Sequence, residues 1–269
     1  MRATKIILIV LLILVSLVFG FTTLRSHLSG EDVGPTIACD TDLLEVSVYA
    51  DDAALLAGVT AADAQDGDLT EAILIQGISK LVDENTTRIT YVVFDSDGNL
   101  ASTSRNLRYT DYTQPQFAIT QPLRYVAGSS VGLLDRLEVT DVIDGDITHL
   151  VRVSALNATD EAEIYTVDLQ VTNSLGDTAR ITLPVIVTSG NASRPVVNLK
   201  TDLVHLNAGD RFSAQSYLQS VVSTNEEATT EDVAITGSVD TNTPGTYFVY
   251  YRCSDSFGTG IAVLTVVVE

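Results

Sequence analysis

The sequence predicts an all-β protein in which three tandem β-sandwich domains follow one N-terminal transmembrane helix. Three observations lead to this prediction. Sequence markers recur about every 80 residues, apolar and polar residues alternate between the markers, and a charge-free apolar run opens the chain. Beyond that run, the sequence does not keep a 3.6-residue apolar period over three helical turns. Strands are therefore expected for the rest of the chain.

The apolar run predicts a membrane anchor. Residues 6–21 carry no charge, and the run extends to Leu24. As a helix it would be about 24–28 Å long, close to the roughly 30 Å of a hydrocarbon core. Arg2 and Lys5 precede it and place the N-terminus in the cytoplasm. We expect a cytoplasmic segment at 1–5, a signal anchor at 6–24 and a juxtamembrane spacer at 25–34. Cleavage after Gly20 as a signal peptide is the alternative.

An internal repeat sets the expected domain boundaries. Pro35, Pro115 and Pro195 lie 80 residues apart, and each opens a short apolar stretch. An Asp-x-x-Asp-Gly-Asp sequence occurs at 63–68 and again at 141–146. A turn ending in glycine occurs at 95–98, 173–176 and 255–258. Because three markers share one period, they indicate a repeated unit. The predicted domains are 35–111, 112–191 and 192–269.

Within each copy, apolar residues alternate with period two, which is typical of strands with one buried face. The matching positions are Ile89, Tyr91 and Val93, then Val167, Leu169 and Val171, then Val249, Tyr251 and Cys253. Units of 75–80 residues with about seven strands suit small sandwiches. Short turns of helix are expected at 53–56 and 213–217.

The composition excludes one class of partner. The formal net charge is -20 at pH 7. A surface this acidic repels phosphate backbones, so we expect no nucleic-acid partner.

The segment 55–70, with its Asp63-x-x-Asp66-Gly67-Asp68 turn, resembles bacterial immunoglobulin-like surface repeats. The Asp-Ser-x-Gly-Asn turn at 95–99 and the Pro-Gly-Thr-Tyr strand entry at 244–247 extend the resemblance over residues 35–269. The resemblance implies immunoglobulin-like sandwiches that serve as spacers or adhesive modules on exported bacterial proteins. The third copy departs from the pattern, because residues 225–229 replace the acidic turn.

The two acidic turns are the candidate metal sites. Carboxylate oxygens are the ligands that Ca²⁺ prefers, and each turn offers three carboxylates. The candidates are Asp63, Asp66 and Asp68 in the first copy and Asp141, Asp144 and Asp146 in the second. The alternative is that these side chains accept hydrogen bonds from backbone N–H groups in a tight turn. No other cofactor is expected.

The cysteines, the histidines and a Gly-x-Ser-x-Gly sequence are expected to have no catalytic or metal-binding role. Cys39 and Cys253 align with aliphatic positions of the other copies, so a disulfide is not expected and both should behave as small apolar residues. The Gly-x-Ser-x-Gly sequence at 128–132 lacks the strand-to-helix context of a nucleophile elbow. His149 and His205 share no polar constellation and are expected to face solvent.

These inferences predict a non-catalytic, single-pass membrane protein with an extracellular C-terminal region. It would act as a structural spacer or adhesion module at a bacterial cell surface. The alternative is a dedicated ligand-binding ectodomain for a glycan, a wall polymer or a partner protein, with calcium as a further component. The partners expected are the membrane, through the N-terminal helix, and a surface protein or polysaccharide.

Overall fold

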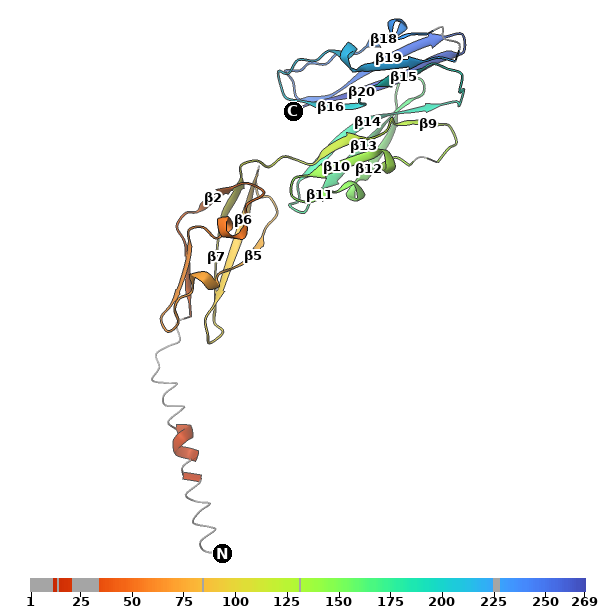
Figure 1. Cartoon of the computed structure of the whole chain (residues 1–269). Coiled ribbons are helices and arrows are strands. Elements are labelled where there is room, and N and C mark those ends of the chain that lie inside the picture. Colours follow the sequence, from red (N-terminus) through yellow and green to blue (C-terminus); the bar gives the residue numbers. More distant parts are fainter. Residues whose placement is uncertain (1–11, 14, 21–33, 84, 131, 225–227) are drawn as a thin grey trace, which may run out of the picture. The chain divides into compact units, whose positions relative to one another are not determined.

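The computed structural model describes residues 12–13, 15–20, 34–83, 85–130, 132–224 and 228–269 (Figure 1). From residue 34 onward, the helical segments of this described part have only three or four residues. The remaining regular structure there is strand. The all-β fold class is therefore confirmed.

The predicted n-region, anchor and spacer fall mostly outside the described residues. Residues 12–13 and 15–20 of the predicted 6–24 anchor are helical. Among the described residues, none of the helices combines the length and apolar character needed to cross a membrane.

The chain divides into two compact units. One comprises Met1–Ser79 and Thr86–Arg108, and the other comprises Lys80–Asn85 and Tyr109–Glu269. Each sheet draws its strands from within one of the three ranges predicted from the repeat. The division into three domains stays a prediction, since ranges 112–191 and 192–269 lie in one unit.

The first unit contains two sheets, with strand orders β1-β3-β4 and β2-β7-β6-β5. Their strands are β1 (Thr36–Cys39), β2 (Leu43–Val46), β3 (Val59–Asp63), β4 (Gly67–Asp68), β5 (Leu74–Ile78), β6 (Thr86–Phe94) and β7 (Leu100–Tyr109). Ile89, Tyr91 and Val93 of β6 are fully buried, as their alternation predicts. The short helix α2 (Asp52–Leu55) begins where the Asp51 side chain accepts a hydrogen bond from the N–H of Ala54 (2.9 Å).

Residues 112–191 form a sandwich of two sheets, ordered β11-β10-β8 and β12-β13-β14-β9. The elements are β8 (Gln116–Ile119), β9 (Arg124–Val126), η2 (Leu134–Arg136), β10 (Leu137–Asp141), β11 (Gly145–Asp146), η3 (Thr148–Leu150), β12 (Arg152–Ala158), β13 (Ile164–Thr172) and β14 (Thr178–Thr188). Phe117 and Val139 of one sheet pack in the same core as Leu169 and Leu183 of the other.

Residues 192–269 repeat the arrangement with sheets β15-β17 and β16-β20-β19-β18. The elements are β15 (Val196–Leu199), β16 (Leu203–Leu206), η4 (Ala214–Tyr217), β17 (Leu218–Val222), η5 (Thr230–Asp232), β18 (Ala234–Thr236), β19 (Gly245–Asp255) and β20 (Gly258–Val268). Val197 of the smaller sheet shares a core with Val249 and Leu264 of the larger one. The helical turns expected at 53–56 and 213–217 are confirmed within one residue as α2 and η4; the first unit also contains η1 (Thr70–Ala72).

The second unit is one body because its two sandwiches share contacts. Ile164, Ile186 and Val263 form a buried apolar cluster drawn from both ranges. Arg194 donates three hydrogen bonds to the Glu163 carboxylate: Nη1 bonds to Oε2 at 2.7 Å and to Oε1 at 3.0 Å, and Nη2 bonds to Oε1 at 3.0 Å. This charge-assisted pair is only about a quarter exposed on either side, at 23% and 25%, so solvent screens it less than a surface pair.

His205 also joins the two ranges, and the prediction that it faces solvent is wrong. Its ring is half-buried; Nδ1 lies 2.9 Å from Glu269 Oε1 and Nε2 lies 2.9 Å from the Phe117 carbonyl oxygen. The sequence conceals this role because Phe117 is 88 residues away along the chain.

A buried arginine ties the α2 turn to the first unit's larger sheet. Arg105 of β7 is 3% exposed. Its guanidinium donates to the carbonyl oxygens of Leu55 (3.2 Å) and Ala57 (2.5 Å) and to the Tyr91 hydroxyl (3.0 Å). It also lies 3.4 Å from an exposed Asp40 carboxylate oxygen. These partners satisfy a charge that is otherwise costly to bury.

Candidate functional site

The carboxylates of the first acidic turn accept hydrogen bonds from other groups of the protein. Asp63 Oδ1 accepts hydrogen bonds from the N–H groups of Gln65 (2.7 Å) and Asp66 (3.0 Å). Asp66 accepts from the N–H (2.7 Å) and hydroxyl (2.8 Å) of Ser96, in the next turn of the same sandwich. Hydrogen bonds from the backbone of Asp66 and Gln65 hold the pKa of Asp63 below its ordinary value.

The second acidic turn has the same geometry. Asp141 Oδ1 accepts from the N–H groups of Ile143 and Asp144, both at 2.9 Å. Asp144 accepts from the N–H (2.6 Å) and hydroxyl (2.7 Å) of Ser174. Asp66 and Asp144 therefore each connect two turns that lie 30 residues apart in sequence.

The third carboxylate of each turn accepts hydrogen bonds from the first residue of the 3₁₀ helix that follows. Asp68 Oδ1 accepts from the N–H of Thr70 (2.9 Å), and Asp146 Oδ1 from the N–H (2.9 Å) and hydroxyl (2.6 Å) of Thr148. These hydrogen bonds lower the pKa of both carboxyl groups, the threonine hydroxyl being the largest cause in each.

The six aspartates thus all accept hydrogen bonds from groups of their own sandwich. The described residues contain no group of three or more His, Cys, Asp or Glu side chains arranged to hold a metal ion. Calcium binding at the turns stays a prediction.

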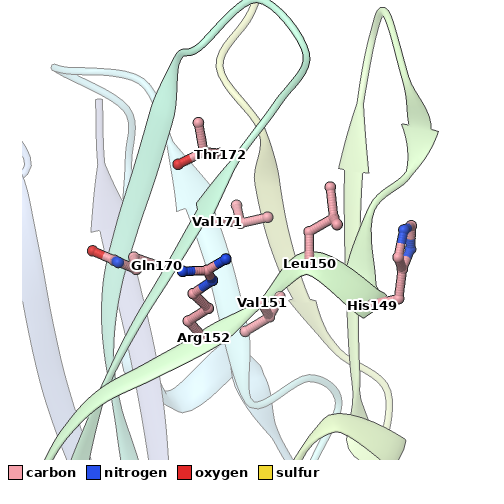
Figure 2. Close-up of a pocket in the computed structure, with 7 residues that line it drawn as sticks. All are labelled: His149, Leu150, Val151, Arg152, Gln170, Val171 and Thr172. Atoms are coloured by element: carbon pink, nitrogen blue, oxygen red, sulfur yellow. The ribbon is translucent and has the colours of Figure 1, made fainter.

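A small cavity on the second sandwich, here called the slot, is the candidate binding site (Figure 2). It has a volume of about 350 Å³, at the small end of the range for small-molecule sites. Its lining residues come from η3, the start of β12 and the end of β13: His149, Leu150, Val151, Arg152, Gln170, Val171 and Thr172.

The slot exists because two paired strands separate. Pairing between β12 and β13 ends at Arg152 opposite Gln170. Before Arg152 the chain turns away into η3, where the N–H groups of Leu150 and Val151 bond to the carbonyl oxygens of Ile147 (2.9 Å) and Thr148 (3.1 Å). The end of β13 therefore has a strand neighbour only on its β14 side.

Two basic side chains line the slot of this acidic protein. Arg152 lies beside Gln170, its pairing partner, and His149 lies beyond Leu150 at the opposite rim (Figure 2). Both are exposed. In the described part of the chain, the arginines that form ion pairs are at positions 105, 108, 194 and 252, so Arg152 has no carboxylate partner there. The charge of His149 acts on Asp146 and helps to lower its pKa, after the bonds from Thr148.

The positions equivalent to Arg152 and His149 carry other kinds of residue in ranges 35–111 and 192–269. Equivalent strand pairs join Leu74 to Val92 in the first range and Ala234 to Arg252 in the third. Leu74 and Ala234 thus occupy the position of Arg152. Glu71 and Glu231 take the position of His149 in the corresponding short helices. Of the three ranges, the second carries a basic residue at both positions.

Arg152 is not among the site residues predicted from the sequence; its difference from Leu74 and Ala234, at the equivalent positions of the other copies, is the signal that marks it. The expectation that His149 is exposed is confirmed. Cys253 is 1% exposed in the third core, as predicted, whereas Cys39 is only half-buried; both are free thiols. The Gly-x-Ser-x-Gly sequence includes Val131, which lies outside the described residues.

Comparison with known families identifies part of the chain. Residues 200–267 match the family model described as "Bacterial surface protein, Ig-like domain". This range covers all but the first strand of the third sandwich.

Two curated proteins resemble larger parts of the chain. An uncharacterized 81.3 kDa protein of Acholeplasma phage L2 is 29% identical over 169 residues, which are 61% of this chain and 22% of that protein. Pesticidal crystal protein Cry22Aa of Bacillus thuringiensis is 33% identical over 127 residues, 45% of this chain and 17% of that protein. The chain spans less than a quarter of the length of either relative.

Solved structures show only distant likeness. One contains the M60 catalytic domain with the CBM51-1 and CBM51-2 domains of Clostridium perfringens ZmpB, with 11% identity, a TM-score of 0.24, and coverage of 87% of this chain and 30% of that chain. Another is human CDH23 EC21-23, with 13% identity, a TM-score of 0.22, and coverage of 87% of this chain and 99% of that chain. Likeness at this level carries no information about ligand or activity.

Proposed function

Because residues 200–267 match the Ig-like domain of bacterial surface proteins, we propose that the chain is a non-catalytic surface protein that acts as a spacer or adhesion module. The family match is the observation that carries the proposal. The shared apolar cluster and the Arg194–Glu163 pair support it, because they give the second unit a fixed internal geometry suited to presenting a surface.

The proposal includes attachment to the cell membrane by residues 6–24, with the sandwiches outside the cell. The charge-free run that follows Arg2 and Lys5 supports this orientation. Sequencing the N-terminus of the mature protein decides between an anchor, which leaves Met1 in place, and a cleaved signal peptide, which leaves a chain starting near Phe21.

Surface location is tested by labelling intact cells with a membrane-impermeant amine or carboxyl reagent. We expect the full chain to be labelled to the same extent before and after lysis, whereas a cytoplasmic control protein is labelled only after lysis. Labelling of the chain only after lysis would reject the proposal.

A second candidate function is a dedicated ligand-binding ectodomain. The slot favours it, because the second range alone places basic side chains where the other ranges have Leu74, Ala234, Glu71 and Glu231. Capture of one defined ligand by the purified chain separates this function from that of a spacer.

A further inference from the structure

The slot has a chemical character opposite to that of the protein around it. The chain carries 35 Asp and Glu residues and 15 Lys and Arg residues, yet the ionisable side chains that line the slot are the basic residues His149 and Arg152. A cation that has no carboxylate partner in an acidic surface creates a local region of positive potential. The slot is therefore suited to an anionic group.

The charge balance of the slot favours a carboxylate. The guanidinium of Arg152 is planar and presents parallel N–H donors that match two oxygens of a carboxylate or a phosphate. With one arginine and one histidine, the slot balances about one negative charge. A doubly charged phosphate would carry excess charge toward a protein whose net charge is -20.

The rest of the lining favours a hydroxyl-rich ring. The Gln170 side-chain amide both donates and accepts hydrogen bonds, as sugar hydroxyls require. Val151 and Val171, both buried, lie behind it as an aliphatic floor. A volume of about 350 Å³ is more than an aspartate or glutamate side chain would fill. β13 bounds the slot on one side, and η3 and β12 bound it on the other.

We propose that the slot binds a monosaccharide unit carrying a single carboxylate, as in a uronic-acid glycan, with Arg152 pairing the carboxylate and Gln170 the neighbouring hydroxyls. This rests on the second candidate function, a ligand-binding ectodomain. It assigns the ligand class to the second sandwich alone, because the equivalent positions in the first range are Leu74 and Val92.

The test measures binding of sodium glucuronate to the purified full chain by saturation-transfer NMR and titration. Glucose, inorganic phosphate and N-acetylglutamate are the comparison ligands. We expect glucuronate to bind with a Kd of about 1 mM, the weak range usual for a few polar contacts. Arg152→Leu should weaken it about tenfold or more, the loss of one charge-assisted contact.

Matched variants control for folding and net charge. Leucine stands at the equivalent position 74 of the first sandwich, so Arg152→Leu should preserve the fold, which circular dichroism checks. His149→Glu introduces the residue found at positions 71 and 231 and should also weaken binding. Arg88→Leu removes an exposed charge from the first unit and should leave binding unchanged.

Four results would overturn the inference: undetectable glucuronate binding, equal binding of glucose, tighter binding of phosphate or N-acetylglutamate, or undiminished binding by Arg152→Leu. These results leave the surface-labelling outcome untouched. Conversely, a chain that labels only after lysis would reject the surface function while glucuronate binding stays measurable in vitro.

Discussion

Arg105 allows a direct test of how the first unit is held together. Arg108, three positions further along β7, forms an ion pair with Glu45 at 3.2 Å, and both side chains are about half exposed (50% and 55%). Arg105 is 3% exposed and donates to two backbone carbonyl oxygens and a hydroxyl. Replacing each arginine by alanine therefore compares a buried network with a surface pair on one strand.

The expected costs differ several-fold. Hydrogen bonds to a charged group contribute about 1.5–3 kcal/mol each, so the two carbonyl contacts of Arg105 sum to roughly 3–6 kcal/mol. Relief of the desolvation penalty of the guanidinium offsets part of this, while the cavity left behind adds to it. We expect Arg105→Ala to cost about 3 kcal/mol and Arg108→Ala about 0.5 kcal/mol.

Urea unfolding of the full chain, followed by far-ultraviolet circular dichroism, measures the difference. With two compact units, two transitions are expected rather than one. For an m-value of about 1.5 kcal/mol/M, a loss of 3 kcal/mol lowers one midpoint by about 2 M. The other transition should stay in place, because Arg105 and its partners all lie in the first unit. A midpoint shift for Arg105→Ala no larger than that for Arg108→Ala would refute the reasoning.

Three further predictions concern groups with unusual surroundings. Burial raises the pKa of Asp202, and the charge of Arg124 only partly offsets this shift. Ionisation of Asp202 therefore destabilises the folded state as pH rises from the ordinary pKa of aspartate through the raised pKa of the folded protein. Asp202→Asn should raise the melting temperature at pH 7 and leave it unchanged near pH 3 in thermal scans. Glu163→Gln removes the carboxylate that Arg194 pairs with and should destabilise the second unit by about 1–2 kcal/mol in urea unfolding, and an unchanged midpoint would show that the pair contributes nothing. The calcium hypothesis predicts that saturating calcium raises the melting temperature relative to chelator by mass action and that Asp68→Asn reduces the gain; equal midpoints with calcium and chelator would reject the metal and leave the turns with a hydrogen-bonding role.

Local patterns in the sequence determined the strands and turns of this protein. The alternation of Ile89, Tyr91 and Val93 predicted a strand with one buried face, because side chains of a strand point alternately to opposite sides. The glycines of the recurrent turns, such as Gly98 and Gly176, have φ angles of 88° and 81°, which other residues rarely adopt. Such features depend on a few neighbouring residues, so one sequence is enough to predict them.

Tertiary structure alone decided which distant groups meet. Arg105 aligns with Leu183 and Leu264 in the other copies and lies among polar residues of its strand, yet it reaches carbonyl groups about 50 residues away. His205 bridges two sandwiches, and the slot opens only because η3 turns away from β13. Asp66 and Asp144 join turns that the sequence separates by 30 residues. Each of these depends on how sheets pack and where strand pairing ends, and alternation along a single strand carries no information about either.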